Sequence, residues 1–242
     1  MKIKVLSSGS SGNCYLLDSG NEILILDCGI PIKDIKIGLN FDISKVVGVC
    51  VTHSHADHSK SVEDFRKMGI PVFAPYESLK PMSFRNWIGT VQSFDLTDLN
   101  GKWMHTNADG SECPCYGFLI THPDIGRLLY ITDTEFVKWR FKNINHILVS
   151  CNYQNKYISE DENSGKKNHV LRGHMELETV KEFAKANNSD ALRNVILCHL
   201  SQDNAEPTEM VAEIKKIVGN GVYVDYARKG FEMELKESWC PF

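Results

Sequence analysis

Apolar positions divide the chain into a strand-rich beginning and a later part in which strands alternate with helices. Short apolar segments at residues 2–6, 14–17 and 22–27 are separated by turn residues, a pattern that predicts a β meander. The continuous apolar run at residues 46–52 has the length of a strand, and its lack of charged positions predicts burial on both faces.

The rest of the chain continues this pattern of short strands with helices between them. Further strands are predicted at residues 71–74, 91–96, 116–121, 127–132, 144–150 and 194–198, with a closing pair at 221–226 and 230–235. Helical spacing predicts helices at residues 32–39, 61–68, 76–86, 176–187 and 207–218. This order fits helices packed outside a sandwich of sheets. The chain shows no internal repeat, low-complexity segment or linker, so we expect one domain over residues 1–242.

Composition and charge narrow the class of protein without identifying a partner. The chain has 242 residues and a net charge of −4, and this charge gives no indication that the protein binds nucleic acid. No apolar stretch reaches the ~18–20 residues that a membrane span needs, and the apolar run at the N-terminus is too short for a signal peptide. Eight cysteines in a chain of this length are better interpreted as reduced thiols. We therefore expect a cytoplasmic protein that makes no membrane contact.

The strongest chemical signal is a histidine-rich run that directly follows the buried strand. It reads His53-Ser54-His55-Ala56-Asp57-His58. Residues two apart at a strand end point to the same side, so His53 and His55 can hold one ion. Once the chain turns towards a helix, Asp57 and His58 can reach a second. Imidazole and carboxylate suit Zn²⁺ and similar first-row metals. The alternative, a polar loop rich in histidine by chance, is poorly matched by this density of ligands.

Two metals need more ligands than one run supplies, and three candidates stand in suitable places. Asp133 ends one predicted strand, and His199 ends another. His105 lies in the polar loop before the strand at residues 116–121. The carboxylate of Asp133 has two oxygens and could bridge two ions.

Further segments accompany the histidine run in a characteristic order along the chain. They are SGSSGN at 8–13, LDCG at 26–29, YITDT at 130–134, Gly173-His174 and His199-Leu200-Ser201. With these segments the sequence resembles the metallo-β-lactamase superfamily, and within it the YycJ/WalJ-type branch, which includes phage-borne relatives. The matching segments extend from residue 8 to about residue 204 and so cover most of the chain.

The resemblance implies an α+β fold, an αββα four-layer sandwich with the site at one edge of the two sheets. Carried over by position, His53, His55 and His105 would bind the first metal. The second would be held by Asp57, His58 and His199, with Asp133 bridging. The segment after His105 departs from the relatives, because it is lengthened by an insertion. All these ligands are nitrogen or oxygen, which leaves Zn²⁺, Mn²⁺ and Fe²⁺ open.

Other residues are candidates for contact with substrate. In similar proteins the counterpart of His174 lies near the metals and touches phosphate or protonates a leaving group; the alternative is a neighbour of a helix cap. The loop at residues 7–13 could form an anion nest or be an ordinary hairpin turn. The substrate contacts that we expect are Ser10, Ser11, Asn13, His174 and Ser201. Asp57 and His174 are the candidate catalytic residues, whereas Asp27 resembles a structural aspartate that braces the metal loops. For His122, His146 and His169 we expect structural or exposed positions.

Two divalent ions ~3.5–4 Å apart lower the pKa of a bridging water, which makes hydroxide available for hydrolysis at neutral pH. The resemblance favours a phosphodiesterase, a nuclease acting on DNA or RNA and specifically an exonuclease. Such an enzyme should gather basic side chains around a cleft, and the candidates are Lys33, Lys36, Arg85, Lys166, Lys167 and Arg172. The alternative is a small-molecule thioesterase or lactonase of the glyoxalase kind, which a narrow apolar pocket would favour. A flavin-linked oxidoreductase, a β-lactamase and a binding protein with a dead site are disfavoured.

Overall fold

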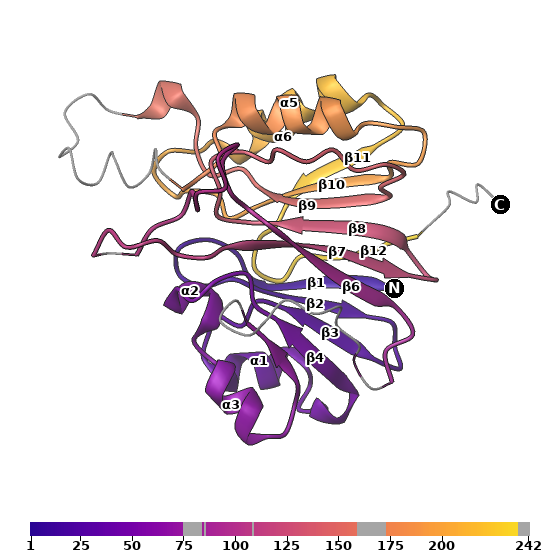
Figure 1. Cartoon of the computed structure of the whole chain (residues 1–242). Helices are drawn as coiled ribbons and strands as arrows, with labels where there is room; N and C mark the ends of the chain where they lie inside the picture. Colours follow the sequence, from indigo (N-terminus) through magenta and orange to yellow (C-terminus); the bar gives the residue numbers. More distant parts are fainter. Residues whose placement is uncertain (75–83, 85, 108, 159–172, 237–242) are drawn as a thin grey trace.

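The fold consists of two six-stranded sheets that face each other, with helices on their outer faces (Figure 1). The computed structural model describes residues 1–74, 84, 86–107, 109–158 and 173–236. The first sheet has the order β12-β1-β2-β3-β4-β5 and the second has the order β11-β10-β9-β8-β7-β6. Within the described ranges no helix is long and apolar enough to cross a bilayer.

The first sheet begins with the predicted meander and ends with parallel strands. Its members are β1 (Lys2–Ser7), β2 (Cys14–Asp18), β3 (Ile23–Leu26), β4 (Val46–Cys50), β5 (Val72–Phe73) and β12 (Glu232–Glu234). The first three strands and β12 pair antiparallel, whereas β4 pairs parallel with β3 and β5. Helices α1 (Ile32–Gly38), α2 (Ala56–Ser59) and α3 (Val62–Lys67) belong to this half, with a 3-10 turn at Ile43–Lys45.

The second sheet repeats this order of pairing along the chain, with antiparallel strands first and parallel strands after them. Its members are β6 (Thr90–Asp95), β7 (Tyr116–His122), β8 (Gly126–Ile131), β9 (His146–Ser150), β10 (Asn194–Cys198) and β11 (Tyr223–Tyr226). Strands β6, β7 and β8 pair antiparallel, and β8 to β11 pair parallel. Helices α5 (Leu177–Asn187) and α6 (Pro207–Val218) cover its outer face, and a 3-10 turn lies at Asn155–Tyr157.

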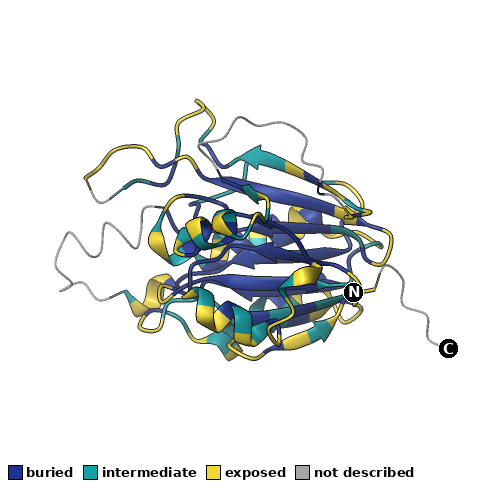
Figure 2. Ribbon diagram, turned by 90° about the horizontal axis from the view of Figure 1, so that it is seen from below, coloured by how far each residue is buried: buried dark blue, intermediate teal, exposed yellow. Residues whose placement is uncertain are grey.

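Three apolar clusters hold these four layers together, which confirms the expected αββα sandwich. The central cluster joins the inner faces of the two sheets through residues such as Tyr15 and Phe118. One outer cluster packs Ile35 and Phe65 under the first sheet, and the other packs Phe183 of α5 with the helix α6 side chains against the second. Figure 2 shows the result, with buried strands between helices that are exposed on one side.

Most predicted elements are present with boundaries shifted by one or two residues, and one difference is informative. The closing strands β11 and β12 do not pair with each other, because β11 extends the second sheet while β12 returns to pair with β1. The predicted helix at residues 76–86 lies mostly outside the described residues. The buried run at residues 46–52 contributes to both the central and the outer cluster, as its composition predicts.

The carboxyl ends of the parallel strands β4, β8, β9 and β10 all lie at the same edge of the sandwich. The segments that follow these strands carry most of the predicted ligands. This edge therefore gathers side chains that are far apart in the sequence.

Candidate metal centre

The turn that carries the histidine run follows β4 and enters the short helix α2. Backbone N–H groups of His58 and Ser59 both donate to the carbonyl of His55 and close the turn. The segment with Gly29 packs directly against it, because a Cβ on Gly29 would lie 1.7 Å from the backbone oxygen of Asp57. The N–H of Cys28 also donates to the carbonyl of His58 at 2.8 Å. A glycine is thus required for the LDCG segment to support the metal turn.

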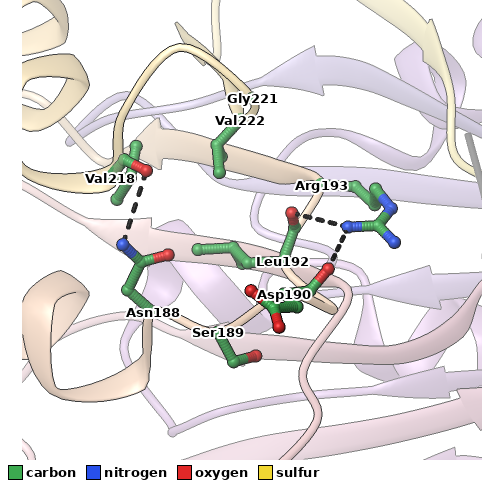
Figure 3. A pocket seen from close by; sticks show the side chains of 8 residues that line it. All are labelled: Asn188, Ser189, Asp190, Leu192, Arg193, Val218, Gly221 and Val222. Atoms are coloured by element: carbon green, nitrogen blue, oxygen red, sulfur yellow. Dashed lines mark hydrogen bonds between the residues drawn. The ribbon is translucent and has the colours of Figure 1, made fainter.

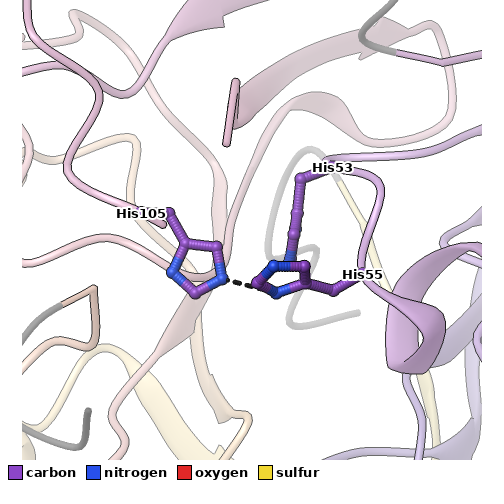
Figure 4. Close-up of side chains that lie close together, drawn as sticks. All are labelled: His53, His55 and His105. Atoms are coloured by element: carbon purple, nitrogen blue, oxygen red, sulfur yellow. Dashed lines mark hydrogen bonds between the residues drawn. The ribbon is translucent and has the colours of Figure 1, made fainter. Parts of the chain in front are cut away.

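Potential ligands form two neighbouring groups at this edge. The first contains His53, His55 and His105; the second contains Asp57, His58, Asp133 and His199. Within each group the ligand atoms all lie within 4.8 Å of one another. In the first group the imidazoles face each other, and Nε2 of His105 lies 2.9 Å from Nδ1 of His55 (Figure 4). The structure therefore brings together all seven residues that the sequence suggested as ligands.

Asp133 lies between the two groups. Its Oδ2 is 3.7 Å from Nε2 of His53 and 3.6 Å from Nε2 of His58. The same oxygen is 3.7 Å from Nε2 of His105, and Oδ1 is 3.4 Å from Nδ1 of His199. The carboxylate thus contacts members of both groups, as the position of a bridging ligand requires.

The protonation states of His53, His105 and Asp133 suit metal binding, whereas that of His58 opposes it. Burial lowers the pKa of His53 and lowers that of His105 to about 4, so both imidazoles are neutral near pH 7. Burial alone would raise the pKa of Asp133, but His199 and His58 outweigh it and hold the pKa well below its usual range. For His58, burial lowers the pKa, but Asp27 and Asp133 outweigh it and raise the value to about 9. His58 therefore carries a proton that a metal must displace.

Asp27 braces the second group from beneath. Its Oδ2 lies 2.7 Å from Nδ1 of His58, which leaves Nε2 of that ring facing Asp57 and Asp133. Thr52 donates to Asp27 from its backbone N–H and its hydroxyl, and Tyr130 donates its hydroxyl at 2.5 Å. A carboxylate behind the imidazole fixes both the tautomer and the ring orientation of a ligand histidine. The bracing role expected for Asp27 agrees with these contacts.

Asn152 and Ser8 fix the position of His199. The side-chain amide of Asn152 donates to the carbonyl of His199 at 2.8 Å, and the N–H of His199 donates to Oγ of Ser8 at 3.0 Å. These contacts hold His199 at a positive φ of 52°, which is uncommon for a residue with a side chain. Asn152 was not among the residues predicted from sequence, because no local pattern links it to a histidine 47 positions later.

Two thiols lie against the first group, which the sequence also did not predict. Sγ of Cys115 is 3.8 Å from Nδ1 of His53, and Sγ of Cys113 is 3.6 Å from Oγ of Ser54. A hydrogen bond between Cys113 and His55 raises the pKa of that imidazole. The CxC segment therefore supports the metal turn from the side of β7.

The insertion after His105 folds back on itself. Thr106 pairs with Glu112 in an isolated bridge, and the N–H of Asn107 donates to the carbonyl of Ser111 at 2.9 Å. The N–H of Cys113 then donates to the carbonyl of His105 at 3.0 Å. The inserted residues begin after His105 and end at Cys113, which is hydrogen-bonded back to His105. They therefore lengthen the loop without removing His105 from the cluster.

His174 completes the group of rings at the site. Its ring stacks on His199 with centroids 5.3 Å apart and planes 18° apart, and its Nδ1 is 3.9 Å from Oδ2 of Asp133. A Cβ on Gly173 would lie 2.4 Å from Nδ1 of His105. The N-cap of α5 is Glu176, whose side chain accepts from the N–H of Glu178. His174 thus lies beside the ligands, and the cap is supplied by another residue.

The other predicted substrate contacts have different environments. Ser10 and Ser11 are exposed in the loop between β1 and β2. Asn13 is fully buried; its side-chain amide donates to the carbonyl of Gly9 at 3.1 Å and lies 3.1 Å from Nε2 of His58, so it joins the loop to the second ligand group. Oγ of Ser201 accepts from the backbone N–H groups of Asp203 and Asn204 and stabilises a turn.

The expected basic cleft is only partly described. Lys33 is exposed and Lys36 half-buried on α1. The other expected members, Arg85, Lys166, Lys167 and Arg172, lie outside the described residues, as does His169. His122 and His146 are buried and structural, with hydrogen bonds to Glu22 and Asn194 respectively.

The chemistry of the donor set fits divalent metal ions. Nε2 of His53 and Nε2 of His199 are buried, and neither has a hydrogen-bond partner. Leaving a buried polar atom unpaired costs ~1–3 kcal/mol, so such atoms call for another partner. Both face carboxylates among nitrogen and oxygen donors that suit Zn²⁺, Mn²⁺ or Fe²⁺.

A hollow of about 470 Å³ lies at the opposite end of β10 from His199 (Figure 3). The side-chain amide of Asn188 donates to the carbonyl of Val218, and the guanidinium of Arg193 donates to the carbonyls of Asp190 and Leu192. These polar side chains brace the loops that form the hollow. The candidate site for hydrolysis is therefore the histidine cluster.

Comparison with known proteins agrees with this site. Residues 8–150, more than half of the chain, match the profile of a family described as the metallo-beta-lactamase superfamily. Exodeoxyribonuclease YycJ of Bacillus anthracis is 26% identical over 226 residues, which cover 84% of each chain. Exodeoxyribonuclease WalJ of Streptococcus pneumoniae is 24% identical over 225 residues, which cover 84% of this chain and 82% of that protein. The metallo-beta-lactamase fold protein YhfI of Bacillus subtilis superposes with a TM-score of 0.64 at 17% identity, over 96% of this chain and 98% of that one.

Proposed function

The chain belongs to the metallo-β-lactamase superfamily, and we propose that it is a dinuclear metal-dependent phosphodiesterase that degrades DNA as an exonuclease. The observation that carries the dinuclear proposal is the place of Asp133. One carboxylate oxygen lies 3.6–3.7 Å from imidazole nitrogens of both ligand groups. A single carboxylate shared between two sets of ligands suits two adjacent ions rather than one.

Each ligand group would hold one ion. His53, His55 and His105 would bind the first, and Asp57, His58 and His199 the second, with Asp133 shared. Bound divalent ions supply Lewis acidity and make water a nucleophile at neutral pH. Zn²⁺ and Mn²⁺ are the proposed ions, with Fe²⁺ also compatible with nitrogen and oxygen ligands.

The residues of the chain would prepare and finish the reaction. Asp27 holds Nδ1 of His58, so that its Nε2 is presented to the ion. Asp57 has one oxygen 3.5 Å from Nε2 of His58 and 3.6 Å from Nε2 of His199. From this position it can orient the attacking water while acting as a ligand. His174 lies at the side of Asp133, from which its imidazole could donate a proton to the leaving oxygen.

DNA is proposed as the substrate because of the relatives and the nature of the site. Two relatives that each cover more than four fifths of the chain are named exodeoxyribonucleases. An additional histidine beside the metal ligands suits a phosphodiester, whose leaving oxygen needs a proton. The hydrolysis of thioesters or lactones by the same ions is the alternative that the experiment must separate.

The reaction is proposed to take place in the cytoplasm. All seven cysteines within the described ranges are free and buried. Unpaired thiols in these positions are compatible with a reducing compartment.

Metal counting combined with a substrate panel tests the proposal. Purified protein should contain close to two ions per chain by elemental analysis, and His55→Ala and His199→Ala should each lose about one. Metal-loaded wild type should degrade single- or double-stranded DNA from its ends, and His55→Ala should not. Fewer than one ion per chain in wild type, unchanged in Asp133→Ala, would contradict the dinuclear site. Turnover of a thioester or lactone with intact DNA would contradict the substrate class.

A further inference from the structure

A basic and aromatic segment leads directly away from the site. Residues 132–145 connect β8, which ends two residues before Asp133, with β9. This connection contains the sequence Lys138-Trp139-Arg140-Phe141-Lys142. Three cations and two aromatic rings in five consecutive residues are the side chains that bind single-stranded nucleic acid in other proteins, through phosphate contacts and base stacking.

A groove of about 280 Å³ runs between this segment and helix α5. It is lined by Phe136, Val137, Lys138, Trp139, Arg140, Thr179, Glu182, Phe183 and Ala186. Both walls begin at the metal centre, because one follows Asp133 and the other follows His174. Trp139 is six residues from Asp133, a span of at most ~20 Å for an extended chain. The groove thus starts within a few nucleotides of the ligands.

Trp139 is held as a partly exposed platform. Its side chain is 46% exposed, although its Nε1–H donates to the carbonyl of Asp95 at 3.2 Å. Lys138 lies over the ring with its Nζ 5.2 Å from the centroid, and this ammonium donates to Oγ1 of Thr97 at 2.6 Å. A tryptophan that is fixed at its edge and open on its surface can stack on a base without first being ordered.

The residues that line the groove include two cations and one acidic side chain. Lys138 and Arg140 line it, and Arg140 is exposed. Glu182 on α5 is the one acidic residue among the lining residues. The ammonium of Lys138 already donates to Thr97 and to the carbonyl of Asp98, so Arg140 is the exposed cation of the groove. An apolar peptide would leave the charge of Arg140 unmatched, whereas a polyanion with flat bases uses both that charge and the ring of Trp139.

We propose that this groove binds a single strand of DNA outside the metal centre, with a base stacked on Trp139 and a phosphate on Arg140. This inference rests on the proposed function, since it assigns the path of the same substrate beyond the reacting phosphate. The groove would position the strand so that its end lies at the ligands.

Binding of a labelled 12-nucleotide single strand, followed by fluorescence anisotropy with a chelator present to prevent hydrolysis, tests the groove. Trp139→Ala should weaken binding about 10-fold, the usual effect of losing one stacked base, and Trp139→Phe should retain most of the affinity. Tyr223→Ala is the matched control, because Tyr223 is 43% exposed on β11 and lies outside the lining of the groove. Equal affinities of Trp139→Ala and Tyr223→Ala would overturn the proposal.

Charge variants give an independent measure. Arg140→Gln should reduce the slope of log affinity against log salt by about 0.7, the value for one phosphate contact on a single strand. Glu182→Gln should tighten binding about 2-fold by removing a like charge at the groove, by the Coulomb term between exposed charges. If Arg140 and Glu182 had only structural roles, Arg140→Gln would leave the salt slope unchanged and Glu182→Gln would not tighten binding. An unchanged salt slope in Arg140→Gln would overturn the phosphate contact.

The outcomes separate this inference from the proposed function. If metal-loaded wild type degrades DNA but the groove variants bind the strand like Tyr223→Ala, the groove is wrong and the proposed function stands. If wild type neither binds nor degrades any DNA, the proposed function fails as well. A larger effect of Trp139→Ala on a matched RNA strand, or an equal effect on a blunt duplex, would overturn single-stranded DNA as the occupant.

Discussion

Asp27 and His58 form a buried pair at the base of the metal cluster, with Oδ2 of Asp27 2.7 Å from Nδ1 of His58. Both side chains are fully buried. The carboxylate lies on the side of the imidazole that faces away from Asp57 and Asp133. It therefore determines which nitrogen His58 presents to a metal.

Replacing Asp27 with Asn should weaken metal binding without removing a ligand. The amide cannot supply the negative charge that supports the imidazole, and loss of such a partner typically costs 10–100-fold in metal affinity. Competition with a chromophoric chelator measures the affinity of each ion. We expect the weaker binding for the ion held by His58, and two ions of unchanged affinity in Asp27→Asn would contradict the bracing role.

The same pair predicts a dependence of stability on pH in the metal-free protein. The folded-state pKa of His58, about 9, is higher than the ~6.5 of an unfolded chain. Its stabilising effect is therefore fully present below pH ~6.5 and is lost as the pH rises through about 9. Between pH 7 and 9 the free energy of unfolding should fall by at most about 1.4 kcal/mol per pH unit in urea titrations. Asp27→Asn should flatten this slope, and identical slopes would sink the assignment.

Gly173→Ala should remove the first ion selectively. A Cβ on Gly173 would lie 2.4 Å from Nδ1 of His105, so the imidazole must move. Gly219→Ala is the matched control, since both glycines have a φ of +86° but nothing lies within 4 Å of a Cβ on Gly219. Both variants should lose about 1–2 kcal/mol of stability from backbone strain. Elemental analysis should find fewer ions in Gly173→Ala alone; equal metal content in the two variants would be the contrary result.

Cys113 should support His55 as a positioning residue. Burial raises the pKa of this thiol, but hydrogen bonds from His55 and Ser54 outweigh it and lower the pKa below its usual value. Cys113→Val removes the hydrogen-bond partner of His55 and should lower the affinity for the first ion about 10-fold, the usual effect of losing such a contact. Cys113→Ser keeps a polar atom there and should restore most of the affinity. Chelator competition that ranks the serine and valine variants equally would exclude this role.

Removing the ions should destabilise the whole fold. Ions at about 1,000 times their dissociation constant add ~4 kcal/mol of stability each, so a chelator should lower Tm by at least about 10 °C in a chain of this size. Addition of Zn²⁺ or Mn²⁺ should reverse the change. His55→Ala, which loses one ligand, should respond less to the chelator, and a Tm that the chelator does not change would show that the sites contribute little to folding.

Much of the fold could be predicted from sequence because its signals are local. Helix α6 begins at Pro207 and ends before Gly219, two residues with strong positional preferences, so both of its boundaries were predicted correctly. The strand at residues 46–52 ends earlier than predicted, at Cys50, because the N–H of Thr52 donates to the side chain of Asp27 and leaves the ladder. That contact joins residues 25 positions apart and has no local signature.

Only part of the candidate site could be predicted from sequence, for the same reason. The histidine run, Asp133 and His199 were recognisable because each directly follows a buried strand. The contacts of Asn152 with His199, and of Cys113 with Ser54, depend on segments that meet only after the two sheets pack together. The contacts of the buried Asn13 amide with the carbonyl of Gly9 and with Nε2 of His58 likewise have no pattern of neighbouring residues that could reveal them.

The ligands come from both sheets, since the histidine run follows β4 of one sheet while Asp133 and His199 follow β8 and β10 of the other. During synthesis the first ligand group is available once His105 has left the ribosome, whereas the second needs His199. Domains generally fold as units as the chain emerges. The metal centre is therefore completed late, when the ions bind ligands from two sheets that have already packed together.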